Sequence, residues 1–265
     1  MKNKYKQISD YWDHISLNYK VAIHITTNDF HYGPLIPGDS KLKLLPNEIE
    51  GKKVLELGAG QAQNSIFLSK KGAKTWATDI SEQQIRLGKE IAEKEKCEID
   101  FSVMPMEEID KLNEKEFDLI HSSYAINFSA DIQKVFNLSY ELLKENGEFI
   151  FSTAHPLFSG EFLTLDSDTG LFLENYFKID ADCRYDDKDN KLIESNFYTI
   201  EELSRFAYNA GFLIKQILEP QCIDISNLTT EECIKQVPYY SNGWSEFHEQ
   251  LRAFPGVVIF KLIKL

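Results

Sequence analysis

The sequence predicts an α/β protein with a mostly parallel sheet of seven strands, helices on both faces, an N-terminal cap and an insertion. Short apolar runs alternate with helical patterns from about residue 52 to residue 153, as in a parallel sheet. A glycine turn follows the first apolar run, and the second run ends on an acidic residue. The chain has 265 residues, of which 43% are hydrophobic and 27% charged, so a substantial core is expected.

Local signals justify each element in chain order. Strands are expected at residues 52–57, 74–78, 99–103, 117–121 and 148–153, and two closing strands at 212–218 and 257–263. Helices are expected at 64–71, 82–96, 132–144 and from Thr199 to about residue 210. Ser81 and Thr199 are favourable helix N-caps, and Gly72 and Gly211 stand where helices are expected to end.

Four segments are expected along the chain. Residues 1–50 precede the first core strand and predict a helical cap, and residues 51–155 form the core that binds the ligand. Residues 156–197 are aromatic and acidic and interrupt the alternation, so we expect an insertion that acts as a substrate lid. Residues 198–265 are expected to complete the sheet and to contain a second irregular insertion.

The glycine turn and the acid after the second strand together predict a nucleoside pocket. The apolar run Val54–Leu57 leads into Gly58-Ala59-Gly60, where glycines allow a sharp turn and a close approach to a ligand. Asp79 closes the second strand, where a carboxylate can accept hydrogen bonds from both ribose hydroxyls. A dinucleotide site would carry a third glycine, but Gln63 stands there. Glu56 would repel a pyrophosphate and suits an ammonium group.

The segment Glu56-Leu57-Gly58-Ala59-Gly60 resembles the first motif of the class I S-adenosylmethionine-dependent methyltransferases, in particular those that act on small molecules. Residues 117–125 resemble the fourth motif of that family, and residues 141–150 resemble its helix–turn–strand segment. The resemblance implies a Rossmann-like methyltransferase fold whose S-adenosylmethionine-binding core is residues 51–155. In residues 101–109 Pro105 stands where many members have an acid that binds adenine. Adenine is then expected between the apolar faces of Ile80, Met104 and Met106.

The resemblance also implies the residues that bind the cofactor. Ser122 and Tyr124 follow the fourth strand, where the family places its contacts with the methionine moiety, and an aromatic face near a sulfonium contributes about 0.5–2 kcal/mol. The full expected set is Glu56, Gly58, Ala59, Gly60, Gln61, Asn64, Asp79, Ile80, Met104, Pro105, Met106, Ser122 and Tyr124.

Methyl transfer from a sulfonium is an in-line displacement that depends largely on holding the reactants in line. A general base is needed only when the acceptor is protonated. His155 follows the fifth strand and is the first candidate for that base, although it can equally end the strand by bonding to the backbone. His31 and Tyr32 lie in a loop that can face the cofactor and are the other catalytic candidates.

Composition argues against several classes of partner. A net charge of −13 disfavours binding to nucleic acid, and no apolar stretch is long enough to span a bilayer. The polar N-terminus and four sparse cysteines favour a cytoplasmic protein, and no set of metal ligands has a recognisable spacing. The sequence leaves open the oligomeric state and the identity of the methyl acceptor. A nicotinamide-dependent oxidoreductase and a non-catalytic S-adenosylmethionine-binding protein remain as alternatives.

Overall fold

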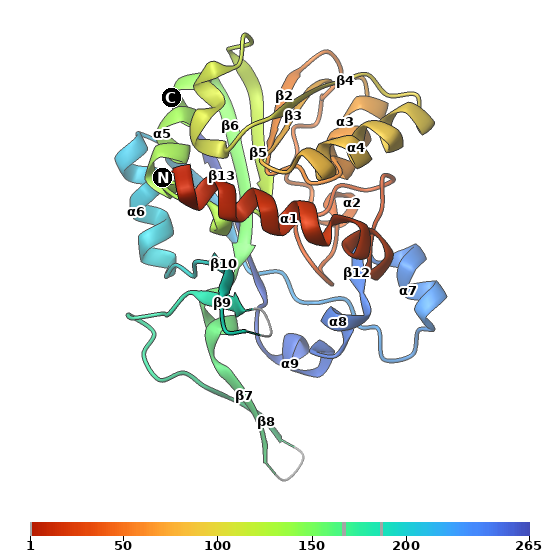
Figure 1. The fold of residues 1–265 in the computed structure, drawn as a ribbon, viewed down its shortest axis with the longest axis vertical. Helices are drawn as coiled ribbons and strands as arrows, with labels where there is room; N and C mark the ends of the chain where they lie inside the picture. The colour runs from red at the N-terminus through yellow and green to blue at the C-terminus, as the bar shows by residue number, and fades with distance from the viewer. Residues whose placement is uncertain (1, 166–167, 186–187) are drawn as a thin grey trace.

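The computed structural model describes residues 2–165, 168–185 and 188–265. Within these residues the main sheet has seven strands in the order β11-β13-β6-β5-β2-β3-β4 (Figure 1). Strands β2 to β6 run parallel to one another, β13 is antiparallel to β6, and β11 is antiparallel to β13. The predicted mostly parallel sheet of seven strands is confirmed.

The elements have the following bounds. The helices are α1 (Lys2–Ala22), α2 (Asp39–Leu42), α3 (Gln63–Lys70), α4 (Glu82–Lys94), α5 (Ile132–Leu142), α6 (Ile200–Ala210), α7 (Thr230–Gln236), α8 (Asn242–Ser245) and α9 (His248–Ala253), with short 3-10 helices η1 (Met106–Lys111), η2 (Ile126–Phe128) and η3 (Pro156–Ser159). The main-sheet strands are β2 (Lys53–Leu57), β3 (Lys74–Asp79), β4 (Ile99–Val103), β5 (Phe117–Ser123), β6 (Leu143–Ala154), β11 (Leu213–Leu218) and β13 (Val257–Ile263). The remaining strands are β1 (Ile23–Ile25), β7 (Glu161–Leu165), β8 (Asp168–Phe172), β9 (Asp182–Tyr185), β10 (Lys191–Ser195) and β12 (Tyr239–Ser241).

Both faces of the sheet are buried by packed elements. Consecutive strand residues point to opposite sides, so neighbours in a strand pack in different clusters. Leu55 packs in a core cluster with Phe136 of α5 and Leu203 of α6. Its neighbour Val54 packs in a second cluster with Phe67 of α3 and with apolar residues of the segment before β2. Helices α5 and α6 therefore cover one face, while α3 and part of the N-terminal segment cover the other.

The order of the strands creates the ligand-binding edge. β2 lies between β3 and β5, and the chain leaves β2 toward one side of the sheet and β5 toward the other. In open α/β sheets such a switch point leaves a crevice beyond the carboxyl ends of the strands. Leu57, Asp79 and Ser123 end the three strands at this edge, and the turns that follow them form the floor of the site.

Helix α1 lies across the carboxyl edge of the sheet (Figure 1). Asp13 joins it to the start of α4, because its Oδ1 accepts hydrogen bonds from Ser81 Oγ (2.6 Å) and the Gln83 backbone N–H (3.0 Å). Ser9 Oγ donates to the Ile80 carbonyl at 3.1 Å. The expected N-terminal helix is present, and these bonds attach it as a cover over the switch point.

The two insertions contain more regular structure than the sequence indicated. The described residues of the segment 156–197 contain η3 and two antiparallel strand pairs, β7–β8 and β9–β10. The region 221–254, expected to be irregular, holds α7, α8, α9 and β12, and β12 pairs with β1 from the N-terminal segment. This pairing was not predicted, because each of the two strands has only three residues, too few for a periodic pattern to indicate a strand.

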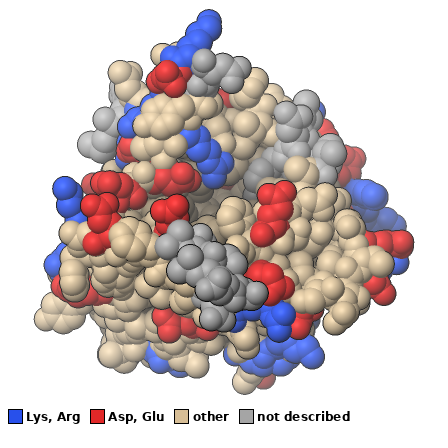
Figure 2. All heavy atoms as spheres, turned by 90° about the horizontal axis from the view of Figure 1, so that it is seen from below, with Lys and Arg blue, Asp and Glu red and all other residues tan. Residues whose placement is uncertain are grey.

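The exposed surface carries charges of both signs. Seen from below, the described residues show basic groups interrupted by acidic ones, and the surface is hollowed near the centre of the view (Figure 2). Across the described residues, no helix is long and apolar enough to cross a bilayer.

Candidate active site

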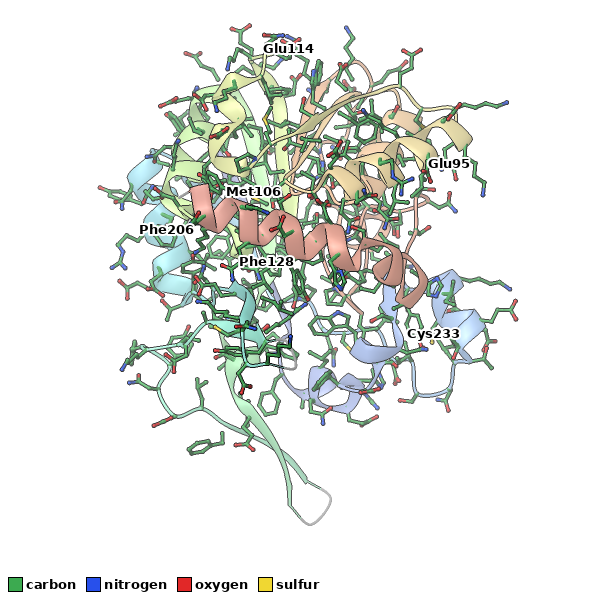
Figure 3. The ribbon with its side chains drawn as sticks, in the orientation of Figure 1. Glu95, Met106, Glu114, Phe128, Phe206 and Cys233 are labelled. Carbon is green, nitrogen blue, oxygen red and sulfur yellow. The ribbon has the colours of Figure 1, made fainter. Side chains whose placement is uncertain are left out.

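A cavity of about 390 Å³ lies at the carboxyl edge, bounded by the turns after β2, β3 and β5 and by α1. Its wall contains most of the residues expected to bind the cofactor: Glu56, Gly58, Ala59, Gly60, Gln61, Asp79, Ile80, Met104, Pro105, Met106 and Tyr124. Met106 and Phe128, labelled in Figure 3, both belong to this wall, together with Ile8 and Trp12 of α1. The fold thus brings together side chains that lie more than 100 residues apart.

Gly58 is required by both its backbone and its surroundings. Its φ of +64° lies in the left-handed region that glycine adopts without steric strain. A Cβ at this position would collide with Met106 Cε and would lie 2.7 Å from Ala125 Cβ. The turn therefore brings bare backbone against the cavity, as the glycine pattern predicts.

Asp79 ends β3 with its carboxylate directed at two loops. Its Oδ2 accepts a hydrogen bond from the Gly60 backbone N–H (2.8 Å), and its Oδ1 accepts one from the Ser81 N–H (2.8 Å). Burial raises the pKa of Asp79 to about 6, although these backbone bonds favour the charged form. Each carboxylate oxygen has a second lone pair, so the group can still accept from a ligand in the cavity.

Glu56 is buried beneath the glycine turn at 3% exposure. Its Oε2 accepts hydrogen bonds from the backbone N–H (3.0 Å) and the hydroxyl (2.6 Å) of Ser65, at the start of α3. Burial nevertheless raises the pKa of Glu56 to about 8. A cationic group in the cavity would stabilise the carboxylate form, so the site is suited to an ammonium.

The residues expected to border adenine come from the segments after β3 and β4 and lie together in the cavity wall. Ile80, Met104, Pro105 and Met106 line one end of the cavity with apolar surface. The acid nearest to the family position is Glu107, two residues after Pro105, and its Oε1 accepts hydrogen bonds from the backbone N–H groups of Ala130 and Asp131. Glu107 thus holds the loop before α5 while contributing to the cavity wall.

Two expected cofactor residues lie outside the cavity wall. Ser122 is fully buried in β5, and Ser123, the next residue, lines the cavity in its place. Asn64 is also fully buried, and its Nδ2 donates to Ser123 Oγ (3.0 Å) and to the His31 carbonyl (3.0 Å). The correction for Ser122 follows from strand alternation, which points neighbouring residues to opposite faces. Asn64 therefore supports the cavity wall through its hydrogen bonds to Ser123 and His31.

Tyr124 occupies the turn after β5 in a left-handed conformation, with φ of +59°. Its backbone N–H donates to the Ser152 carbonyl at 3.0 Å, which fixes this conformation. The ring packs edge-on against Trp244 with centroids 5.8 Å apart, and both residues line the cavity. An aromatic pair therefore stands beside the turn that was expected to meet the methionine moiety.

His155 and Tyr32 do not reach the cavity wall. His155 Nε2 lies 2.7 Å from Glu219 Oε1, and its Nδ1 accepts from the Leu157 N–H at 3.1 Å. Both ring nitrogens are thus occupied, and the alternative role of ending the strand describes this residue. Tyr32 is 1% exposed and donates its hydroxyl to Asp39 Oδ1 at 2.7 Å. Neither geometry suits a general base for a substrate in this cavity.

His31 is the one catalytic candidate that lines the cavity. Asn64 holds its backbone on both sides, because Asn64 Oδ1 accepts from the His31 N–H at 2.9 Å and Nδ2 donates to its carbonyl. Its ring packs edge-on against Tyr239, and among the described residues Nδ1 has no hydrogen-bond partner. Burial lowers the pKa of His31 to about 3, so the ring is neutral near pH 7.

The sequence did not identify the residues that close the cavity from above. They come from α1, η2, the β9–β10 hairpin and the C-terminal insertion: Tyr5, Ile8, Trp12, Phe128, Arg184, Tyr239 and Trp244. The aromatic N-terminal segment indicated a cap, but it gave no sign of which residues face inward. Trp12 and Phe128 pack edge-on with ring centroids 5.2 Å apart, so the cap rests on η2. The described residues contain no cluster of three or more potential metal ligands.

Comparison with known proteins identifies a family and several relatives. Residues 49–211 match a family model described as a methyltransferase domain. An uncharacterized protein of Haemophilus influenzae is 32% identical over 141 residues, which cover 50% of this chain and 54% of that protein. The uncharacterized methyltransferase YbaJ of Bacillus subtilis is 28% identical over 183 residues, covering 64% of this chain and 69% of the relative.

The fold is also similar to a solved structure. An S-adenosylmethionine-dependent methyltransferase from Mesorhizobium loti superimposes with a TM-score of 0.65 at 19% identity, over 84% of this chain and 95% of that chain. The chain matches only about half the length of the Haemophilus relative.

Proposed function

The chain belongs to the class I S-adenosylmethionine-dependent methyltransferases, and we propose that it transfers the methyl group to a small-molecule acceptor. The family model covers more than half of the chain, and the strand order with its switch-point cavity is the matching architecture. The cofactor is S-adenosylmethionine, which replaces the nicotinamide alternative raised by the glycine turn.

The main support for a small-molecule acceptor is the covered cavity. Its volume of about 390 Å³ lies in the range of about 300–1,000 Å³ typical of small-molecule pockets. Side chains from α1, β9 and α8 lie above it and narrow its opening. A small organic molecule suits this space, whereas a folded macromolecule would have to displace the cover.

The arrangement of acids supports one orientation of the cofactor. We assign Asp79 to the ribose hydroxyls, because it ends β3 beside the glycine turn and lines the cavity. Ile80, Met104 and Met106 then receive the adenine, and Glu56 receives the ammonium of the methionine moiety. The methyl group consequently points away from the adenine toward Tyr124 and the aromatic roof.

The chemistry assigned to this site depends on proximity and exclusion of water. S-adenosylmethionine supplies the activated methyl group when it is bound. The protein holds the acceptor in line with that group, which can lower the activation barrier by at most about 7–11 kcal/mol. His31 is neutral and has a low pKa, so it is a poor proton acceptor near pH 7. We assign it instead to hydrogen bonding that orients the acceptor.

Methyl transfer itself provides the test. The protein is incubated with methyl-labelled S-adenosylmethionine in three separate reactions. Each reaction contains one fraction of the same cell extract: a small-molecule filtrate, a protein fraction or an RNA fraction. We expect label to enter only small molecules, and Asp79→Asn to weaken S-adenosylhomocysteine binding by about 1.5–3 kcal/mol. Label in the protein or RNA fraction would contradict the small-molecule acceptor. Cofactor binding with no transfer to any fraction would favour a non-catalytic binding protein.

A further inference from the structure

Arg184 is the only lysine or arginine among the described residues that line the cavity. The acids of the wall, Glu56, Asp79 and Glu107, all belong to the strand edge and to η1. Arg184 belongs to β9, whose partner strand β10 is bonded to α1. We propose that Arg184 binds a carboxylate of the methyl acceptor, so that the substrate is an apolar or aromatic acid. This proposal rests on the proposed transfer to a small molecule.

The hairpin that carries Arg184 is fixed to the body of the protein. Gln7 Nε2 of α1 donates to the Lys191 carbonyl of β10 at 2.7 Å, and Lys4 Nζ lies 3.1 Å from Glu194 Oε1. The backbone N–H of Asn196, just after β10, donates to the Asn127 carbonyl of η2 at 2.9 Å. Contacts with two different elements therefore hold the hairpin as part of the cavity wall.

The guanidinium is oriented by an aromatic ring. It lies over the ring of Tyr11 at 5.7 Å from the centroid, and Nη1 donates to Tyr11 Oη at 2.7 Å. Its Nε lies 3.8 Å from Asp182 Oδ2, and both of these side chains are 46% exposed. Exposed pairs of this kind contribute at most about 1 kcal/mol. A planar guanidinium held in place by Tyr11 can present the paired N–H groups that match the geometry of a carboxylate.

The surroundings of Arg184 define the rest of the ligand. Tyr11 packs against Trp12 with ring centroids 5.5 Å apart, and Trp12 packs against Phe128. Trp12 and Phe128 both line the cavity, so apolar surface leads from the arginine toward the region assigned to the methyl group. The Asp79 carboxylate at the strand edge disfavours a second anion there. A molecule with one acidic end and an apolar body is therefore favoured in a single orientation.

A carboxylate at Arg184 has two possible sources, the acceptor and the methionine moiety of the cofactor. The experiment separates them by saturating the cofactor site with S-adenosylhomocysteine, after calorimetry has established its affinity for the wild type and each variant. Benzoate and its neutral analogue benzamide are then titrated, with binding measured by ligand-observed NMR. An absence of S-adenosylhomocysteine binding by the wild type would count against the proposed function itself.

With the cofactor site filled, we expect the wild type to bind benzoate about ten-fold more tightly than benzamide, since an arginine–carboxylate contact is charge-assisted. Arg184→Gln should abolish this preference without changing S-adenosylhomocysteine affinity. Arg205→Gln, which removes an exposed arginine of α6 paired with Glu201, should keep the preference. Equal binding of the two probes by the wild type would overturn the proposal, as would a preference that survives Arg184→Gln. Weaker S-adenosylhomocysteine binding by Arg184→Gln would assign the arginine to the cofactor and also overturn it.

Discussion

Glu56 Oε2 accepts two hydrogen bonds from one residue, Ser65, through its backbone N–H and its hydroxyl. These bonds favour the carboxylate, but the desolvation of a group that is 3% exposed outweighs them and raises the pKa to about 8. This raised pKa favours the protonated acid near neutral pH, and a cation in the cavity would favour the carboxylate. The same residue that destabilises the empty protein at high pH is suited to bind the cofactor.

Glu56→Gln should stabilise the empty protein as the pH rises. The pKa of Glu56 is raised from 4.5 to about 8 in the folded state, so the folded protein binds a proton that the unfolded chain releases. The stability that this proton contributes is complete below pH 4.5 and is lost as the pH rises through 8. The difference in the free energy of unfolding between the variant and the wild type should be on the order of 3 kcal/mol more favourable to the variant at pH 7 than at low pH. Urea unfolding at pH 5 and pH 7.5 measures the change.

A matched control separates this effect from charge removal in general. Glu95 is partly exposed and pairs with Lys70 at 2.9 Å, which holds the pKa of that carboxyl below its usual value. Glu95→Gln should therefore give no stabilisation as the pH rises. The assignment of Glu56 would be rejected by parallel pH profiles for the wild type and Glu56→Gln.

Gly58→Ala should cost more stability than the same change at Gly51. Both glycines have positive φ, +64° and +73°, so an added Cβ strains the backbone by about 1–2 kcal/mol at either position. A Cβ at Gly51 meets nothing within 4 Å, whereas one at Gly58 collides with Met106 and Ala125. This overpacking should add about 1–3 kcal/mol and distort the adenine region. Urea midpoints and S-adenosylhomocysteine affinity provide the measurements, and equal costs for the two variants would contradict the close approach.

The sequence predicted the sheet, and residues singled out at its strand ends line the cavity, because both features depend on local patterns. Gly58, Asp79 and Glu56 lie at strand ends, where the periodicity and the turn chemistry are both visible. Ser122 was assigned in place of Ser123 because both faces of β5 are buried, so an apolar run gives no sign of which neighbour faces the ligand. The side chain that lines the cavity is one residue later in the strand, at Ser123.

The roof was harder to predict, for a different physical reason. Arg184 and Trp244 reach the cavity only through tertiary contacts, the attachment of β10 to α1 and the pairing of β1 with β12. Such pairings join segments more than 180 residues apart and leave no periodic trace in either segment. From the sequence alone, a charged residue in a polar hairpin is expected to be exposed to solvent. Only the tertiary position of the hairpin shows that it lines a cavity.

Asp13→Ala should loosen the cover formed by α1. Asp13 accepts hydrogen bonds from Ser81 Oγ and the Gln83 N–H, and hydrogen bonds to a charged group contribute about 1.5–3 kcal/mol. Their loss should raise the dissociation rate of S-adenosylhomocysteine by about ten-fold or more, measured by stopped-flow displacement. Asp10→Ala is the matched control, because Asp10 is on the same helix and pairs with Lys6 on the exposed surface. Equal dissociation rates for the two variants would show that the Asp13 contacts do not restrain the cover.

His155→Gln and His31→Gln should affect different properties, stability for the first and acceptor binding for the second. His155 bonds to Glu219 and to the Leu157 N–H outside the cavity, so its variant should lower the melting temperature while kcat stays within about two-fold. His31 lines the cavity, so its variant should raise the acceptor KM. Because the pKa of His31 is lowered to about 3, the ring stays neutral from pH 5 to pH 9, and kcat should show no step near pH 6.5. A loss of about 100-fold in kcat for His155→Gln with unchanged cofactor affinity would instead make His155 the base, and would require the segment around η3 to move toward the cavity during turnover.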